Sequence, residues 1–397
     1  MNKFDPLSKA VNYSTQRVNK SGVLLENYVT TESLLPDKEG VGPSTKLPTQ
    51  DGNINKYSRG NILVSNIRPY LKKIWYADKE GGCSSDVLVF SVKEEYNSKF
   101  VYYAMLSDDF FEHMMRGSKG TKMPRGDKTQ ILEFKIPRVD LPIQGKIAEA
   151  LSVLDTKIDL NNKINEQLES MAKLLYEYWF INFEFPMSID QAASIGKLHL
   201  VGHPYQSSGG KMTYNETLKR EIPVGWSSTT LGKILRLYQP KTIAEKDLKS
   251  DGDFFVYGAN GIVGKYDKFN HEEPQVALTC RGSCGKLNRT MPFSWITGNA
   301  MVLAPREIKL NIEYIYNLAK FSGINSIITG SVQPQITRAN LQDVKTISPD
   351  PNVVAAYQEL TDSICKKRVN LELQNQKISS LRNWLLPFLM SGQITVK

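Results

Sequence analysis

The stretch QGKIAEALSVLDTKIDLNNKINEQLESMAKLLYEYWF, residues 144–180, decides the fold. Its seam positions alternate in steps of four and three residues, and a second such series runs from 353 to 388. Alternation of this kind is typical of a coiled coil, in which a narrow stripe of one helix faces a partner helix. The sequence therefore predicts two long helices that pack against each other. Their seam positions are 147, 151, 154, 158, 161, 165, 168, 172, 175 and 179 in the first helix, and 353, 357, 360, 364, 367, 371, 374, 378, 381, 385 and 388 in the second.

Polar residues occupy the middles of both seams. They are Asn161 and Asn165 in the first helix, and Lys367 and Gln374 in the second. An antiparallel pair with aligned centres places Asn161 near Gln374. The same alignment places Asn165 near Lys367. A buried amide costs stability when it is mispaired, so we expect these positions to fix the register. The alternative, in which each helix packs on its own globular domain, stays open.

The length of the helices suggests their purpose. A helix from residue 143 to residue 180 spans roughly 57 Å at 1.5 Å per residue. On B-DNA this distance is about one and a half turns, given a turn of ~34 Å. Two DNA-binding domains held that far apart would contact two short sequences separated by unread base pairs, which is a bipartite target.

The chain also contains an internal repeat, with equivalent segments roughly 210 to 225 residues apart. Six segments recur in the same order, and an order shared by six is unlikely to arise by chance. They are LSKAV (7–11) and LGKIL (231–235), ILVS (62–65) and VALT (276–279), DVLVF (86–90) and NAMVL (299–303), aromatic-rich helices at 100–106 and 314–319, GTKMP (120–124) and GSVQP (330–334), and ILEFK (131–135) and LQDVK (341–345).

These observations predict an α+β protein. Two similar mixed α/β domains are joined by two long helices packed as an antiparallel coiled coil, with a pseudo-two-fold internal repeat. The chain of 397 residues is long enough for two domains. The expected parts are a first domain (1–142), a central spacer helix (143–183), a linker (184–221) containing SSGGK, a second domain (222–351), a C-terminal spacer helix (352–390) and a tail (391–397).

Composition adds modest constraints. Lys and Arg number 50 against 41 Asp and Glu, a net charge of +9 that only slightly favours an anionic partner. The N-terminus lacks the apolar run of an export signal, and no stretch of 18 apolar residues occurs. We therefore expect a cytoplasmic protein whose four cysteines are reduced.

DNA binding requires cations for phosphates, and Arg, Lys, Asn or Gln side chains for base edges. The loops of both domains carry such residues. Any one of them can be a solvated surface residue, so we expect DNA contact of the clusters. The candidates are Arg68, Lys72, Lys73, Arg116, Lys119, Lys122, Arg125 and Lys128 in the first domain, and Lys265, Lys268, Arg281, Lys286, Arg289, Gln333, Gln335 and Arg338 in the second.

Three other motifs have simpler interpretations. CRGSC (280–284) offers two thiols, but a structural zinc site needs about four ligands, and only His271 lies nearby. The spacing of YGANGIVGK (257–265) fails the Gly-x-x-x-x-Gly-Lys-Ser/Thr pattern of a phosphate-binding loop, and Tyr266 stands where the Ser or Thr ligand of magnesium belongs. A turn-rich hairpin is expected instead. Tyr178, Trp179 and Phe180 are expected to be packing anchors rather than base-stacking platforms.

No catalytic residue or metal site is predicted. The sequence contains neither a methyl-transfer motif of the Asn-Pro-Pro-Tyr type nor a nucleotide-binding loop. The four histidines, His113, His199, His203 and His271, show no triad-like or metal-like spacing. A duplicated scaffold also argues against a single catalytic centre.

The same residues support a resemblance to a known family. The chain resembles the specificity subunits of type I restriction–modification systems along essentially its whole length. The segments that carry the resemblance are GNILVSNIRP (60–69), GTKMP (120–124), QGKIAEALSVLD (144–155), LYEYWF (175–180), IPVGW (222–226) and LLPFLMSGQI (385–394).

The resemblance implies more than the spacing does. Each domain would be a target-recognition domain that reads one half of a split, asymmetric sequence in double-stranded DNA. The helices would separate the two domains and dock two methylation subunits, which two restriction subunits would join. S-adenosylmethionine, ATP and magnesium would bind those partners, and this chain would bind no cofactor. The alternative is a stand-alone DNA-binding or architectural regulator, which would lack neighbouring methyltransferase and nuclease genes.

Overall fold

The computed structural model describes residues 3–49, 51–120, 122–249, 252–259, 261–281, 284–306, 309–330 and 334–394. The chain divides into two compact units, residues 1–160 with 374–397, and residues 161–373. The long helices α5 (Leu141–Tyr176) and α10 (Pro351–Met390) contribute a segment to each unit. Among the described residues, no helix is long and apolar enough to cross a membrane.

The first unit is built around a four-stranded antiparallel sheet in the order β2-β9-β6-β7. Its central strand β6 is buried at all four positions. Because side chains alternate across a strand, Ile62 and Val64 enter one core, and Leu63 enters another on the opposite face. This explains the uninterrupted apolar run ILVS. The strands are β2 (Val11–Tyr13), β6 (Ile62–Ser65), β7 (Ile74–Tyr76) and β9 (Val87–Val92).

Smaller elements complete this unit. A second sheet has the order β3-β5-β8-β4, and β1 pairs antiparallel with β10. The remaining strands are β1 (Phe4–Pro6), β3 (Arg17–Asn19), β4 (Tyr28–Val29), β5 (Asn53–Tyr57), β8 (Gly81–Cys83) and β10 (Lys135–Pro137). The helices are α1 (Leu7–Ala10), α2 (Ser98–Met105), α3 (Asp108–Arg116) and α4 (Lys128–Ile131).

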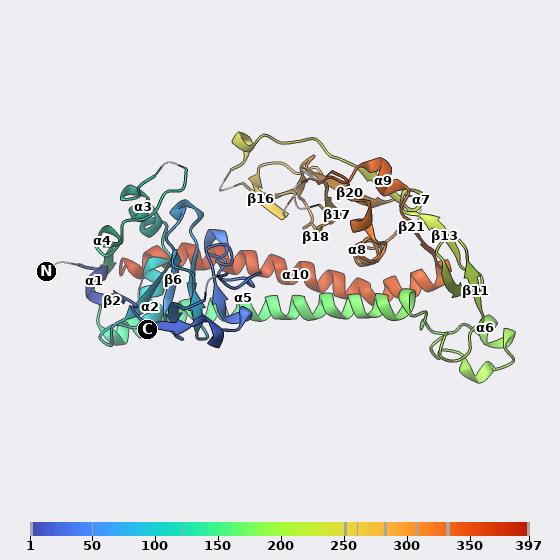
Figure 1. Ribbon diagram of the computed structural model, residues 1–397, viewed down its shortest axis with the longest axis horizontal. Helices are drawn as coiled ribbons and strands as arrows, with labels where there is room; N and C mark the ends of the chain where they lie inside the picture. The colour runs from blue at the N-terminus through green and yellow to red at the C-terminus, as the bar shows by residue number, and fades with distance from the viewer. Residues whose placement is uncertain are drawn as a thin grey trace. The chain divides into compact units, whose positions relative to one another are not determined.

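The second unit repeats the β2-β9-β6-β7 sheet and the β1–β10 pair, but its third sheet has three strands instead of four. Its four-stranded sheet has the order β14-β20-β17-β18, β13 pairs with β21, and a third sheet has the order β16-β15-β19 (Figure 1). The predicted internal repeat is therefore present in strand order as well as in sequence. The elements are β13 (Ser227–Thr230), α7 (Leu231–Ile234), β14 (Leu235–Tyr238), β15 (Phe254–Gly258), β16 (Gly261–Tyr266), β17 (Val276–Thr279), β18 (Leu287–Arg289), β19 (Trp295–Ile296), β20 (Ala300–Pro305), α8 (Ile312–Phe321), α9 (Arg338–Gln342) and β21 (Lys345–Ser348).

A hydrogen-bond pattern attaches each domain to its long helix in the same way. In the first unit, the Asn97 side chain caps α2, and its backbone N–H donates to Gln144 of α5 at 2.9 Å. In the second unit, Asn311 caps α8, and its backbone N–H donates to Gln358 of α10. A capping asparagine thus joins the cap and the long helix in both copies.

Within each unit, α5 and α10 pack antiparallel (Figure 1). In the first unit, Arg382 of α10 donates to Asp155 of α5 at 2.7 Å, and Leu389 of α10 shares a core with Ile147 of α5. Residue numbers therefore fall along α10 as they rise along α5. The hydroxyl of Tyr103 on α2 also donates to Asp155, at 2.6 Å. Asp155 therefore joins both long helices to the first domain.

The second unit has an aromatic core around the end of α5. Tyr357 of α10 donates to the carbonyl of Ala172 at 3.1 Å, and its ring contacts Tyr176 and Phe180. Trp179 and Phe180 are buried, which confirms them as packing anchors. Tyr178 is 43% exposed, so that part of the prediction is wrong. A π-helical turn at Glu177–Ile181 ends the helix.

The predicted seam is right in α5 and wrong at three of its eleven positions in α10. Every seam position of α5, including Asn161 and Asn165, is buried or half-buried. In α10, eight of the predicted positions are also buried or half-buried: 353, 357, 364, 371, 374, 378, 385 and 388. Leu360, Lys367 and Leu381 are exposed, and the neighbouring residues Thr361, Arg368 and Arg382 lie inside.

Arg368 and Arg382 lie inside because carboxylates in each unit accept hydrogen bonds from them. Arg368 donates to Glu313 at 2.6 Å, and Arg382 to Asp155 at 2.7 Å. The regular steps of three and four residues select the adjacent Lys367 and Leu381 instead. Lys367 is therefore not a register residue, and its expected pairing with Asn165 is wrong. The pairing of Asn161 with Gln374 stays a prediction.

Residues 184–221, expected to be a flexible linker, are packed into the second unit. The segment contains α6 (Ile189–Ser194) and the hairpin of β11 (Met212–Asn215) with β12 (Arg220–Pro223). The ring of Phe185 stacks on Tyr205 and Trp226, with centroids 4.7 and 4.8 Å away. Glycine and serine mark turns here, whereas the aromatic residues on either side form the core.

We predict that Arg382→Ala weakens the first unit. Removing the guanidinium leaves Asp155 half-buried without its cation, which should cost about 2–3 kcal/mol. Hydrogen exchange of the β6 amides in denaturant measures the loss. The control is Lys56→Ala, which removes a more exposed ion pair to Glu80 (3.4 Å) and should cost less than about 1 kcal/mol. Equal effects of the two variants would contradict the role given to Arg382.

Candidate nucleic-acid interface

Two loops of the first unit form one surface at the end of β6. The residues after β6 pair with the loop between α3 and α4, because the N–H of Arg68 donates to the carbonyl of Pro124 at 2.8 Å. Lys119 and Arg125 exchange backbone hydrogen bonds at 3.0 Å, which closes the second loop. A Cβ on Gly126 would lie 3.0 Å from the side-chain oxygen of Asn66, so glycine permits the close approach.

The first loop contains backbone strain. Arg68 and Lys72 have φ values of 51° and 50°, on either side of a turn at Pro69–Leu71. Left-handed conformations are unfavourable for residues other than glycine and often occur at functional sites. Arg68 is exposed, as are Tyr70 of the same turn (50%) and Met123 of the second loop (49%). Sequence reasoning missed Tyr70 and Met123 because it searched for charge and amide groups only.

Most predicted cations of the first domain lie at this surface. Arg68, Lys119, Lys122, Arg125 and Lys128 are exposed. Several form surface ion pairs, which contribute little to stability and leave the cation accessible to DNA. The pairs are Arg125 with Asp86 (3.0 Å), Lys119 with Asp127 (3.7 Å) and Lys72 with Asp108 (2.8 Å).

Lys73 has a structural contact instead. Its ammonium donates to the backbone carbonyl of Thr31 at 2.6 Å. Burial lowers the pKa of Lys73 from its ordinary value, and Glu32 opposes this shift. The ammonium is therefore turned into the domain, and we correct its assignment as a DNA contact.

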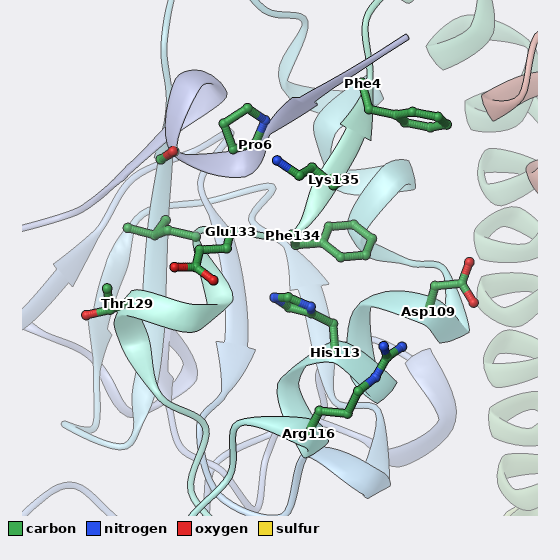
Figure 2. A pocket seen from close by; sticks show the side chains of 11 residues that line it. Phe4, Pro6, Asp109, His113, Arg116, Thr129, Glu133, Phe134 and Lys135 are labelled. Carbon is green, nitrogen blue, oxygen red and sulfur yellow. The ribbon is translucent and has the colours of Figure 1, made fainter. Parts of the chain in front are cut away.

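Arg116 belongs to a different surface. Figure 2 shows it on α3 with Asp109 and His113, beside a pocket that also contains Phe134. The pocket does not present His113 as a free base, since its Nε2 lies 2.7 Å from the carbonyl oxygen of Gln130. Arg116 is exposed there, so its contact with DNA stays a prediction.

The second unit has an equivalent loop pair. Thr329 and Gln335 exchange backbone hydrogen bonds at 3.0 and 2.8 Å, and Gln335 forms a bridge with Arg281 after β17. The corresponding bridges in the first unit join Arg125 to Lys119 and to Ile67. Four candidates are exposed at or near this loop pair: Arg281, Lys286, Gln335 and Arg338. Gln333 lies outside the described residues.

Arg289 is wrong as a DNA contact. Its side chain is 8% exposed and donates to Glu313 at 2.7 Å and to Glu169 at 3.0 Å. Its guanidinium also lies 3.3 Å from the ring centroid of Tyr316. Glu313 is fully buried, and a buried carboxylate requires cationic partners. Arg289 therefore fixes β18 to α8 and α5.

The two lysines of the third sheet region lie apart from these contacts. Lys265 is half-buried on β16, with its ammonium 5.6 Å from the ring centroid of Phe255. Lys268 is exposed beyond the same strand. Neither has a bond to the loop pair among the described residues, so their role in DNA binding stays a prediction.

The fold shows the structural context of the YGANGIVGK segment and of the two cysteines of CRGSC. Residues 254–258 and 261–266 form the antiparallel pair β15–β16, which confirms the hairpin interpretation of YGANGIVGK. Burial raises the pKa of the Cys280 thiol to about 11, and Cys284 donates its thiol to the carbonyl of Pro334 at 2.9 Å. The described residues contain no group of three or more His, Cys, Asp or Glu placed to hold a metal ion.

Two equivalent domains, each presenting a cationic loop pair, define a duplicated nucleic-acid-binding protein. Residues 17–170 and 223–381 each match the type I restriction modification DNA specificity domain. The chain therefore belongs to the family of type I restriction–modification DNA specificity subunits.

The chain is similar in sequence to specificity subunits over most of its length. It is 23% identical to the type I restriction enzyme MjaIX specificity subunit of Methanocaldococcus jannaschii, covering 76% of this chain and 70% of that one. It is 22% identical to the HindI specificity subunit of Haemophilus influenzae, covering 85% and 87%. The crystal structure of a type I S subunit from M. genitalium shares the fold, with a TM-score of 0.51 and 16% identity over 98% of this chain and 95% of that one.

We predict that Lys122→Ala lowers affinity for all DNA sequences. Loss of one phosphate contact should reduce the slope of log affinity against log salt by about 0.9. Fluorescence anisotropy at several salt concentrations measures both quantities. Lys73→Ala is the matched control, and it should leave the slope unchanged because its ammonium is bonded inside the domain. If Lys122→Ala kept the wild-type slope of log affinity against log salt, Lys122 would not contact a phosphate.

Proposed function

We propose that this specificity subunit reads a bipartite, asymmetric sequence in double-stranded DNA, one half with each domain. The observation that carries the proposal is the duplicated loop pair, closed by Lys119 and Arg125 in one unit and by Thr329 and Gln335 in the other. The backbone bonds are equivalent, but the side chains differ. Equivalent frames with different side chains suit two half-sites of different sequence.

The long helices serve as the spacer in this proposal. The 36 residues of α5 correspond to about 54 Å of helix. The inward Arg368 and Arg382 of α10 each bond a carboxylate within their own unit, which supports a stiff attachment of each domain to the helices. A stiff spacer would set the number of unread base pairs between the half-sites.

Catalysis belongs to partner subunits on this proposal. Two methylation subunits would dock on the helices, two restriction subunits would join them, and S-adenosylmethionine, ATP and magnesium would bind to those partners. Two of the four histidines are already engaged: His113 contacts the carbonyl of Gln130, and His271 bonds the hydroxyl of Tyr238 at 2.8 Å. The complex would act in the cytoplasm.

Methylome sequencing tests the function directly. Cells that carry this chain with its methylation subunit should show adenine methylation at one two-part motif. Cells that carry either protein alone should show none. Methylation by the purified chain alone, or methylation without a two-part motif, would overturn the proposal.

The spacer role predicts the effect of a longer helix pair. Seven residues inserted after Leu160 in α5, together with seven after Leu373 in α10, preserve the heptad phase and add about 10.5 Å. At 3.4 Å per base pair, the gap should widen by about three base pairs, with both half-sites unchanged. Motif sequencing measures the gap. Seven residues inserted after Glu216, in the exposed turn of the β11–β12 hairpin, should leave it unchanged. An unchanged gap in the double insertion would contradict the spacer role.

A further inference from the structure

One side-chain position is equivalent in the two domains and carries base-reading chemistry in both. Arg125 bridges to Lys119 and Ile67, and Gln335 bridges to Thr329 and Arg281. The same pair of backbone contacts holds each residue, so the two side chains leave the loop from equivalent points. Both residues are exposed.

The two side chains differ in the base that they recognise. An arginine donates two parallel hydrogen bonds to O6 and N7 of guanine, and a glutamine forms a bidentate pair with N6 and N7 of adenine. We infer that Arg125 and Gln335 are the equivalent base-reading residues of the two domains. Arg125 recognises a G·C pair in one half-site, and Gln335 recognises an A·T pair in the other. This inference rests on the proposed reading of a bipartite target.

Neighbouring positions show a contrasting pattern. The first residue of α4 is Lys128 and the first residue of α9 is Arg338, so this position is cationic in both domains. Phosphates are common to all sequences, and a cation kept in both copies suits a phosphate. Lys119 and Thr329 share no bidentate chemistry. Of these loop positions, the one held by Arg125 and Gln335 combines a planar, two-pronged group in both copies with a different base preference.

An acidic neighbour orients Arg125. Asp86 lies directly before β9, and its carboxylate is 3.0 Å from a terminal nitrogen of the Arg125 guanidinium. The backbone N–H of Asn66 donates to the carbonyl of Asp86 at 2.8 Å, which ties this residue to the first loop. A guanidinium held on one side presents its remaining N–H groups in a fixed direction, as bidentate recognition requires.

The test is a reciprocal exchange read by methylome sequencing in cells that also carry the methylation subunit. Arg125→Gln should change the preference at one base pair of one half-site from G·C toward A·T, by about 5- to 150-fold relative to the wild type. Gln335→Arg should make the opposite change at one base pair of the other half-site. The gap and the untouched half-site should stay the same, which also shows that each variant is folded and assembled.

Two control variants make the same exchanges outside the loop pairs. Arg138 has the same side-chain exposure as Arg125 (59%) and also pairs with an aspartate, Asp5, outside the loop pair. Gln275 lies before β17, at the strand end opposite Arg281. Arg138→Gln and Gln275→Arg should leave the motif unchanged.

The outcomes separate this inference from the proposed function. A wild-type chain without a two-part motif overturns both. Two results with a two-part motif overturn the inference alone. In one, Arg125→Gln leaves the motif unchanged; in the other, methylation falls at every site without a change in the preferred base. If a variant abolishes methylation, competition binding with duplexes carrying each of the four base pairs at every half-site position decides. Loss of the G·C preference supports a base contact, and uniform weakening overturns it.

Discussion

The rest of the structure depends on the ion pairs between two arginines of α10 and carboxylates inside each unit. In the first unit, Asp155 accepts from Arg382 and from the hydroxyl of Tyr103, so one carboxylate joins α2, α5 and α10. In the second unit, Glu313 accepts from Arg368 and Arg289, and joins α8, α10 and β18. A DNA-reading loop can hold a fixed direction only if its domain is fixed to its support.

The cost of burying these carboxylates favours a single orientation of each domain on its long helices. Removing a carboxylate from water costs several kcal/mol, and only well-placed cations and donors compensate for it. Glu313 is fully buried and bonds two arginines, and the burial of Tyr103 beside Asp155 raises the pKa of that hydroxyl, which keeps it a donor. A rotated or shifted domain would leave the acid inside without its partners. The contacts therefore select one orientation, even where their net contribution to stability is small.

The sequence predicted those features in which apolar pattern and physical role coincide. The α5 seam, the internal repeat and the hairpin at residues 257–265 follow from spacing and turn residues, and the structure contains them. The α10 seam is wrong at positions 367 and 381 because the neighbouring Arg368 and Arg382 lie inside, and a hydrophobic pattern places arginine outside. Charge also misled at Arg289, since neither its burial nor its partner Glu313 can be known before the fold.

The candidate site could be predicted at the level of clusters and not of single residues. Arg68, Lys122 and Arg125 do lie on one surface, but Lys73 from the same run bonds Thr31 inside the domain. What separates them is the backbone path of each loop, which depends on bonds between segments far apart in the sequence, such as Arg68 to Pro124.

The same loops explain how specificity can vary without a change of fold. Main-chain hydrogen bonds close both loop pairs, and they do not depend on the side chains at positions such as Arg125 and Gln335. Substitution there changes the chemistry presented to DNA and leaves the frame intact. The carboxylates that attach the domains to the helices cannot vary in this way, because loss of a cationic partner leaves a desolvated charge. On the proposed function, a new target requires changes only at the loop surface, and the attachment of each domain to the helices can persist while that surface changes.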